Sequence, residues 1–439
     1  MNPSSQFSRF VAPIAVALCV ACLPVPATAD DPGEFRALFN GNDLEGWQAM
    51  PHTNPTEFAA LDESERESKL AGWMEQAEQH WSVEEGELVN DGKGPYLVTE
   101  DEFRDYELQL KYKTVARADS GIYLKATPQV QIWDTTDPGK FKLGADKGSG
   151  GLWNNSAGAA GKDPMVKADK PFGEWNEVRV VQVGARTSVW LNGQMVVNHA
   201  IMENYWDRES PLFVTGPIEL QTHGGEIRWK DIRVRELSAS EANTLLSEKG
   251  PMGFESVFNG TDLAGWQGAT DSYEVIDGAV RCKKGTGGNL LTEKEYGDFV
   301  ARLEFRLPPG GNNGLAIRAP LKGDPAYQAM CELQVLDNVH PKYSRLDDRQ
   351  YHGSAYGMVA AARGFQRPVG EWNFQEVTVR GSTIKVELNG NVILDTDVSK
   401  VVDYMADRPH PGKDREKGFF GFAGHGDAVE YRNVKIREL

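Results

Sequence analysis

Apolar and polar residues alternate along many short runs of the chain. Five of these runs are YELQLKYKT from Tyr106, VQIWD from Val130, TSVWLNG from Thr187, CELQVLD from Cys331 and IKVELNG from Ile384. A two-residue period predicts strands with one buried face, and the Gly, Asn, Asp and Pro residues between the runs predict turns. Asn-Gly at 192–193 and at 389–390 predicts two-residue hairpins, because both turn positions need positive φ. The pattern therefore predicts an all-β antiparallel sandwich.

The chain carries this pattern twice. FRALFNGNDLEGWQ from Phe35 returns as FESVFNGTDLAGWQ from Phe254, and the last strands of the two copies end at Leu237 and Leu439. A repeat of roughly two hundred residues lets each copy bury its own core. We expect a first domain at 32–238, a linker at 239–252 and a second domain at 253–439. Residues 56–80 predict a helical insertion in the first copy only, and 238–250 predict a short helical linker.

Residues 1–29 are typical of a secretory signal. Arg9 precedes an apolar run, and Ala27-Thr28-Ala29 suits signal peptidase. We expect export to the periplasm or the extracellular space. Cys22 raises the alternative of a lipoprotein anchor, which is less favoured because Cys19 stands where such signals prefer Leu. No other segment predicts a transmembrane span.

Composition narrows the partners. The formal net charge of −17 argues against nucleic acid, which requires a basic surface, and is compatible with a neutral ligand such as a sugar. Cys282 and Cys331 follow the signal segment, and we expect buried free thiols rather than a disulfide framework. The sequence predicts no oligomeric state.

Several motifs together resemble one family. They are FNGxDLxGW, the strands GIYLKA and GLAIRA, the strands QVQIWD and ELQVLD, the GEWN turn, the LNG hairpin and the HG pair before the closing strand. In this order, and in both copies, they resemble the 3-keto-disaccharide hydrolase family. The resemblance implies two tandem concanavalin A-like jelly rolls that act on 3-keto-glycosides.

Strand parity places a set of polar residues on one face. In GLAIRA, Leu315 and Ile317 should face the core, so Arg318 should point the other way. In ELQVLD the same rule places Glu332 and Gln334 on that outer face, where carboxylate and amide groups suit a polyol. The counterparts in the first copy are Lys125, Gln129 and Gln131. A sheet face exposed to solvent is also polar without any ligand.

Further candidates lie at strand ends. Asp337 and Asp134 end matching strands, and His425 and His223 precede matching glycines; the alternative role is a turn or structural one in each case. His352 in the second copy is matched by Ser149. Tyr356 is matched by Trp153, and an aromatic ring there could stack on a sugar or pack in the core.

Elimination suits these residues better than a two-carboxylate glycosidase mechanism. Asp337 lies five residues after Glu332, so a regular strand would place their carboxylates on opposite faces. We expect Glu332 or His425 to act as the base that removes the C2 proton of a 3-keto sugar, with Arg318 stabilising the developing charge.

Other interpretations remain open. Glu332, Asp337, His352 and His425 could instead hold a divalent cation. A carbohydrate-binding protein without turnover and a structural surface protein are the competing classes. Because Gln129 stands in the place of Glu332, we expect the first copy to have lost or changed the chemistry, with binding retained.

Overall fold

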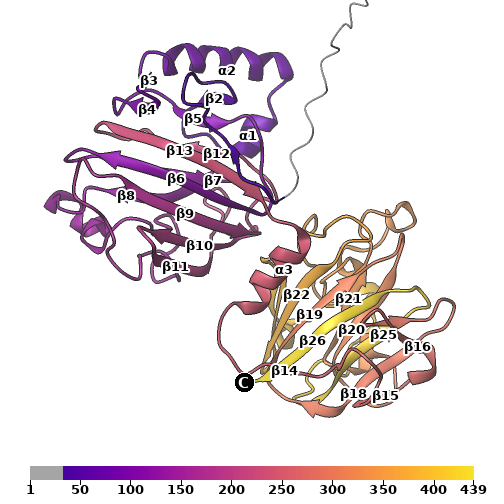
Figure 1. Cartoon of the computed structure of the whole chain (residues 1–439). Helices are drawn as coiled ribbons and strands as arrows, with labels where there is room; N and C mark the ends of the chain where they lie inside the picture. The colour runs from indigo at the N-terminus through magenta and orange to yellow at the C-terminus, as the bar shows by residue number, and fades with distance from the viewer. Residues whose placement is uncertain (1–32) are drawn as a thin grey trace, which may run out of the picture. The chain divides into compact units, whose positions relative to one another are not determined.

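The computed structural model describes residues 33–439, and they form two β-sandwiches in tandem (Figure 1). The secretory signal expected at 1–29 lies outside the described residues. Each sandwich has its own hydrophobic core, one built from residues 39–234 and the other from 258–436. The all-β fold predicted for each copy is confirmed. No helix within 33–439 is long and apolar enough to cross a membrane.

The first sandwich pairs an eight-stranded sheet with a five-stranded one. The larger sheet runs, in spatial order, β11 (Gln194–Ile201), β10 (Arg186–Leu191), β9 (Asn176–Val183), β6 (Tyr106–Thr114), β13 (Ile227–Glu236), β4 (Glu87–Asn90) and β3 (Trp81–Glu84), with β1 (Arg36–Ala37) also paired to β13. The smaller sheet runs β2 (Trp47–Met50), β5 (Tyr96–Thr99), β12 (Ile218–Leu220), β7 (Asp119–Leu124) and β8 (Thr127–Trp133).

The second sandwich repeats this topology. Its larger sheet runs β16 (Tyr273–Ile276), β17 (Ala279–Cys282), β26 (Glu430–Glu438), β19 (Phe299–Arg306), β22 (Asn373–Arg380), β23 (Thr383–Leu388) and β24 (Asn391–Asp397), with β14 (Glu255–Ser256) paired to β26. Its smaller sheet runs β15 (Trp266–Gly268), β18 (Gly288–Tyr296), β25 (Gly418–Gly424), β20 (Asn312–Ala319) and β21 (Cys331–Leu336). The short helix α4 (Pro325–Gln328) connects β20 to β21.

The predicted hairpins form as expected. Asn192 and Gly193 have φ of 51° and 79° between β10 and β11, and Asn389 and Gly390 have φ of 47° and 83° between β23 and β24. Two consecutive positive φ angles match the twist of antiparallel strands. Cys282 and Cys331 are buried free thiols, as predicted.

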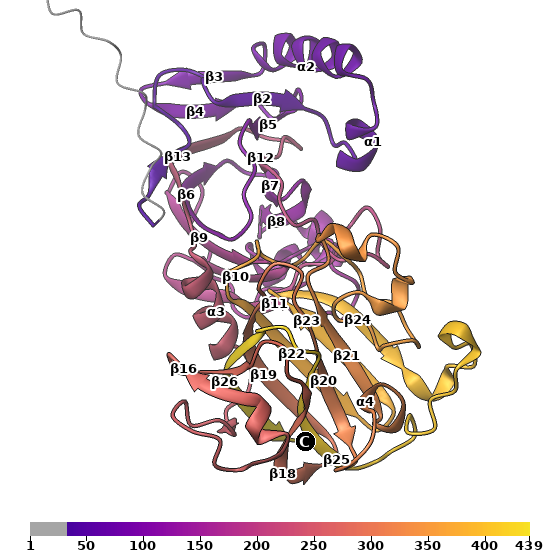
Figure 2. The same ribbon diagram turned by 90° about the vertical axis from the view of Figure 1, so that its right-hand side faces the viewer.

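The predicted insertion in the first copy is helical and covers part of the smaller sheet. It forms α1 (Pro55–Ala59) and α2 (Glu63–Ala77), and α2 lies alongside β2 (Figures 1 and 2). Phe58, Leu70 and Trp73 pack on a cluster that includes Tyr96 and Tyr123. We call the face of each smaller sheet that points away from the core its open face. The insertion therefore covers part of the open face in the first sandwich.

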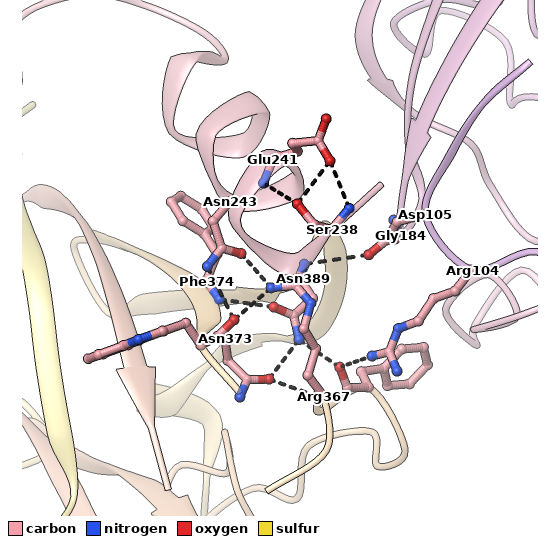
Figure 3. A network of polar contacts seen from close by, with 12 residues as sticks. Arg104, Asp105, Gly184, Ser238, Glu241, Asn243, Arg367, Asn373, Phe374 and Asn389 are labelled. Carbon is pink, nitrogen blue, oxygen red and sulfur yellow. Dashed lines mark hydrogen bonds and ion pairs between the residues drawn. The ribbon is translucent and has the colours of Figure 1, made fainter. Parts of the chain in front are cut away.

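The predicted helical linker is α3 (Ala239–Glu248), which packs against the larger sheet of the second sandwich. Ser238 and Glu241 form a reciprocal capping box at its start (Figure 3). The Asn243 amide donates to Glu304 on β19 at 3.1 Å and accepts from Arg367. Because these groups are buried, their mutual hydrogen bonds offset the cost of removing them from water.

Candidate functional site

Strand parity places the predicted polar residues of the smaller sheets as expected near the strand centres. Leu315 and Leu333 pack in the core of the second sandwich, as Ile122 and Val130 do in the first. Glu332 pairs in register with Ala316, which belongs to a separate cluster on the open face. The side chains of Glu332 and Gln334 therefore lie on the open face, opposite the core.

The second sandwich brings a carboxylate and a histidine together on this face. The Nε2 atom of His425 lies 3.4 Å from Oε1 of Glu332. Glu332 is buried, whereas the side chain of His425 is 47% exposed. Gly314 makes room for the pair, because a Cβ atom there would lie 2.1 Å from Oε1 of Glu332. The histidine is thus the member of the pair that an incoming ligand can reach.

Burial and pairing set the protonation of these two groups. Burial raises the pKa of Glu332, and the neighbouring His425 acts in the opposite direction. The hydrogen bond to Glu332 raises the pKa of His425, while partial burial opposes it. Because both pKa values are raised, the pair holds a proton more tightly than either group does alone in water. Once that proton leaves, the pair can accept one from a ligand.

Two more predicted residues line the second site. The Gln334 amide donates to Oδ1 of Asn312 at 2.6 Å, which leaves its carbonyl oxygen available. The Tyr356 hydroxyl accepts from Gln350 at 3.0 Å, and its ring meets Tyr327 edge to face. Amide and hydroxyl groups beside an aromatic ring are the usual constituents of a sugar site.

The first sandwich contains a histidine–carboxylate pair of its own. Nδ1 of His223 lies 3.0 Å from Oδ2 of Asp119, and Lys140 binds the same carboxylate. The Gln131 amide donates to the other oxygen of Asp119 at 2.8 Å and accepts from Gln129. The hydrogen bond to Asp119 raises the pKa of His223. Burial acts to raise the pKa of Asp119, but His223 and Lys140 outweigh it and lower that pKa.

The carboxylate comes from different strands in the two sandwiches. Gly121 is the third residue of β7 and pairs with Gln131 on β8. Gly314 is likewise the third residue of β20 and pairs with Gln334 on β21. This register aligns Asp119 with Asn312, and Gln129 with Glu332. The first sandwich has its acid on β7 and an amide on β8, and the second has an amide on β20 and its acid on β21. The sequence prediction missed Asp119, although the aligned glycines of the repeat would have pointed to it.

The first sandwich surrounds its pair with aromatic side chains. Asp119, His223, Gln129 and Gln131 line a cavity of about 200 Å³. Its aromatic lining residues are His52, Tyr96, Tyr123, Trp133, Trp153 and Tyr205. His52 comes from the connection between β2 and β3, which spans residues 51–80; the corresponding connection in the second sandwich spans only 269–272. The longer connection of the first sandwich therefore contributes one side chain, that of His52, to the wall of this cavity.

The family comparison covers both sandwiches. The model of the 3-keto-alpha-glucoside-1,2-lyase-like domain matches residues 34–235 and again 253–437. The chain belongs to this family. A 3-keto-disaccharide hydrolase of Bacteroides thetaiotaomicron is 25% identical over 246 residues, covering 47% of this chain and 85% of that protein. The resemblance found in the sequence is confirmed.

Solved structures match one sandwich of this family member at a time. A predicted glycosyl hydrolase of Parabacteroides distasonis ATCC 8503 is 26% identical, with a TM-score of 0.39, and covers 43% of this chain and all of that one. The carbohydrate-binding module CBM66 of Bacillus subtilis is 14% identical, with a TM-score of 0.28, over 40% of this chain and 96% of that one.

Arg318 and Lys125 lie elsewhere than strand parity predicted. Both residues have positive φ, 50° and 53°, so the strand geometry breaks where parity would have continued. The Arg318 guanidinium donates to the backbone oxygens of Gly297, Gly381 and Arg415 and to Asp298. The Lys125 ammonium donates to the Gly184 oxygen at 3.0 Å, and burial lowers its pKa to about 8. These contacts tie loops together, so Arg318 is not placed to stabilise charge beside Glu332.

Asp337 and Asp134 bind backbone amides at the ends of their strands. Asp337 accepts from the Gly310 nitrogen at 2.8 Å, and Asp134 accepts from the Arg117 nitrogen at 2.7 Å. These contacts are those of the turn role, one of the two alternatives that the sequence leaves open for these residues. Asp337 consequently does not join Glu332 as a second carboxylate.

His352 lies in the core of the second sandwich rather than on the open face. Its ring lies 4.8 Å from that of Phe305, and neither ring nitrogen has a hydrogen-bond partner. Burial lowers its pKa to about 3. The cation site suggested for Glu332, Asp337, His352 and His425 is therefore not formed, and no group of three such ligands occurs within residues 33–439.

Proposed function

We propose that this chain cleaves 3-keto-glycosides by elimination followed by hydration, at the open face of the second sandwich. The observation that carries the proposal is the approach of His425 to the buried Glu332. Membership of the 3-keto-alpha-glucoside-1,2-lyase-like family and the name of the Bacteroides relative support this substrate class. The sequence of residues 1–29 supports export, so the glycoside would be met outside the cytoplasm.

The chemistry requires one base of moderate strength. The C3 ketone acidifies the C2–H bond, so a neutral imidazole can take that proton. The electron pair of the C2–H bond then forms a C1–C2 double bond, and the C1–O bond breaks. The leaving oxygen takes up a proton, and water adds across the double bond, with hydroxyl at C1 and hydrogen at C2. The net change is hydrolysis, and every proton is accounted for.

The geometry assigns a separate task to each residue. His425 is accessible and serves as the base, while Glu332 orients the imidazole and stabilises its protonated form. The Gln334 carbonyl and the Tyr356 hydroxyl bind sugar hydroxyls. A two-carboxylate mechanism is disfavoured, because the carboxylate of Asp337 is engaged by the Gly310 amide.

The test uses the full chain carrying His223→Ala. Of the two histidines that pair with a carboxylate, this variant retains only His425. Adding His425→Ala should lower the turnover of a 3-keto-disaccharide by about 10² to 10⁴, the usual contribution of a general base. Adding Glu332→Gln instead should also lower turnover. His340→Ala is the matched control, because His340 is a loop histidine whose ring accepts only from the backbone of Lys342.

Three outcomes would contradict parts of this scheme. Full turnover after Glu332→Gln would remove the carboxylate from it. Full turnover after His425→Ala would assign the base to another group. If the unmodified chain binds a 3-keto-disaccharide but releases no product, the carbohydrate-binding interpretation replaces the enzymatic one.

A further inference from the structure

The first sandwich has a histidine–carboxylate pair of its own, His223 with Asp119, although Gln129 stands where the second sandwich has Glu332. We propose that this sandwich is a second catalytic centre, in which His223 is the base and Asp119 takes the role that Glu332 has in the second sandwich. The inference rests on the proposed function, since it assigns the same reaction class to another site. It reverses the expectation that the first copy had lost its chemistry.

The exchange of acid and amide preserves the pair. Asp119 and Gln129 stand where the second sandwich has Asn312 and Glu332, so each site has one acid and one amide in opposite positions. The histidine keeps the same place before the closing strand in both sandwiches. Asp119 binds it through Nδ1, whereas Glu332 approaches Nε2 of its counterpart. Nε2 of His223 is therefore the nitrogen left to accept a proton.

The surroundings of Asp119 favour a fixed carboxylate. The group is buried, and it receives hydrogen bonds from Gln131 and Lys140 in addition to His223. The side chain of His223 is 58% exposed. A carboxylate held from three sides orients an accessible imidazole, which is the arrangement a general base needs.

The cavity limits the substrate to about one sugar ring at the reacting end. Its 200 Å³ is below the roughly 300–1,000 Å³ typical of pockets for drug-sized ligands. His52 and Tyr205 line the cavity and lie 5.3 Å apart, and Trp133 and Trp153 also line it and meet edge to face at 6.1 Å. Aromatic walls around a polar floor suit a single pyranose ring. We therefore assign this centre to a terminal 3-keto-glycosyl unit.

The reaction balances as it does in the second sandwich. His223 takes the C2 proton, the electron pair forms the C1–C2 double bond, and the C1–O bond breaks toward the leaving group, which takes a proton from solvent. Water then adds its hydroxyl at C1, and C2 regains a proton. No oxidant, reductant or other co-reactant is needed.

The test separates proton removal from bond cleavage. The full chain with His425→Ala retains only the first centre, and it is incubated in D₂O with 3-keto-1,5-anhydroglucitol, which has no glycosidic substituent at C1. Deuterium incorporation at C2, measured by NMR, reports the base alone. Release of sugar from a 3-keto-disaccharide reports the complete reaction. We expect both activities in His425→Ala, and a loss of about 10² to 10⁴ in each when His223→Ala is added.

Exchanging the acid and the amide distinguishes catalysis from folding. In the His425→Ala chain, Asp119→Asn should lower C2 exchange by up to about 10⁴, the loss that follows when the carboxylate partner of a catalytic histidine becomes an amide. Adding Gln129→Glu recreates the arrangement of the second sandwich and should restore most of the exchange. A purely structural role for Asp119 predicts no recovery.

Each result has one meaning. If His425→Ala alone abolishes exchange and cleavage, the second centre does not exist, while the proposed function stands. If His425→Ala is fully active and His223→Ala is inactive, the second sandwich loses its assigned role and the present inference stands. If C2 exchange depends on His223 but no variant cleaves a disaccharide, the proposed function fails while the base assigned here survives. Failure of Gln129→Glu to restore exchange would overturn the role of Asp119.

Discussion

The open faces of the two sandwiches share one register and differ in what fills it. Across three neighbouring strands, the first sandwich has Val98, Glu219 and Tyr123 side by side. The same row in the second sandwich is Leu291, Gly421 and Ala316. In the first sandwich, Val98 and Tyr123 pack with side chains of the helical insertion. In the second, Leu291 and Ala316 pack with Ala329, beside the short helix α4. The two faces are therefore covered by different segments of the chain.

This difference shows which features the duplication has kept. The histidine before the closing strand is common to both sandwiches, as is a carboxylate that pairs with it. The strand that supplies the carboxylate and the side chains around it are not common. The side chains around the pair differ widely between the two sandwiches. Glu219, whose pKa burial raises to about 8, stands where the second sandwich has Gly421. The histidine–carboxylate pair is thus the chemistry that the two sandwiches share.

The largest expected effect on stability concerns the residues that end matching strands, Arg318 and Lys125. Arg318→Met should destabilise the second sandwich by about 3 kcal/mol, because it removes a buried guanidinium with four acceptors. Lys125→Met removes one hydrogen bond and should cost the first sandwich about 1 kcal/mol. Hydrogen-exchange mass spectrometry measures each sandwich separately. Equal losses would show that the two cations do equivalent work.

The next effect compares two glycines at the same place in the strand. A Cβ at Gly314 would lie 2.1 Å from the Glu332 carboxylate, whereas one at Gly121 would lie 3.0 Å from the Gln129 side chain. We expect Gly314→Ala to displace Glu332 and lower turnover by the second sandwich about 100-fold, the cost of misplacing a catalytic group by about 1 Å. Gly121→Ala is the matched change and should have the smaller effect on the first sandwich. Steady-state kinetics in the His223→Ala and His425→Ala chains measure each value.

A smaller effect follows from His352, which has Ser149 as its counterpart in the first sandwich. The pKa of His352 is lowered to about 3 from an ordinary value of 6.5, so between these pH values only the unfolded state binds the proton. The stability of the second sandwich should therefore fall by about 1.4 kcal/mol for each pH unit below 6.5. His352→Phe should remove the share of this dependence that comes from His352 and leave the share of His410, whose pKa burial also lowers. The slope of the first sandwich should stay unchanged and serves as the internal control. Exchange measurements at pH 6.5 and 5 test the slope, and an unchanged slope in His352→Phe would rule out this histidine as its source.

The sequence predicts the fold well, because the alternation of apolar and polar residues in a strand depends only on residues next to one another in the chain. Alternation along 314–317 and 332–335 identifies which side chains enter the core and which reach the open face, and the structure agrees. The rule fails at Arg318 and Lys125, where positive φ ends the alternation. The apolar pattern does not indicate this change of backbone conformation, because each residue occupies what would be the next polar position of a regular strand.

The candidate site was less predictable, because it depends on contacts between strands. The identity of residue 129 alone suggested that the first copy had lost its acid. Only the pairing of β7 with β8, and the position of the closing strand, show that Asp119 reaches the histidine instead. The residue type of His352 predicts a metal or substrate ligand. Its actual position beside Phe305 depends on the path of a loop into the core, which the local sequence does not indicate. Residue types identify candidates, and the tertiary contacts decide among them.

The smallest expected effect is a difference between the pH profiles of the two centres. Pairing with a carboxylate raises the pKa of both His223 and His425, and a protonated imidazole cannot act as a base. The rate at each centre should therefore rise with pH through a pKa above the ordinary value of 6.5. Lys140 opposes the rise in the pKa of His223, whereas Asp324 and Asp427 add to the rise in the pKa of His425. Lys140→Met should therefore move the profile of the first centre to higher pH. Measurements of kcat/KM against pH in the His425→Ala and His223→Ala chains compare the centres. Because Lys140 also binds Asp119, its removal leaves the carboxylate to His223 and Gln131, which acts in the same direction. A shift to lower pH, or an equal shift in both chains, would show that Lys140 does not act through the pair.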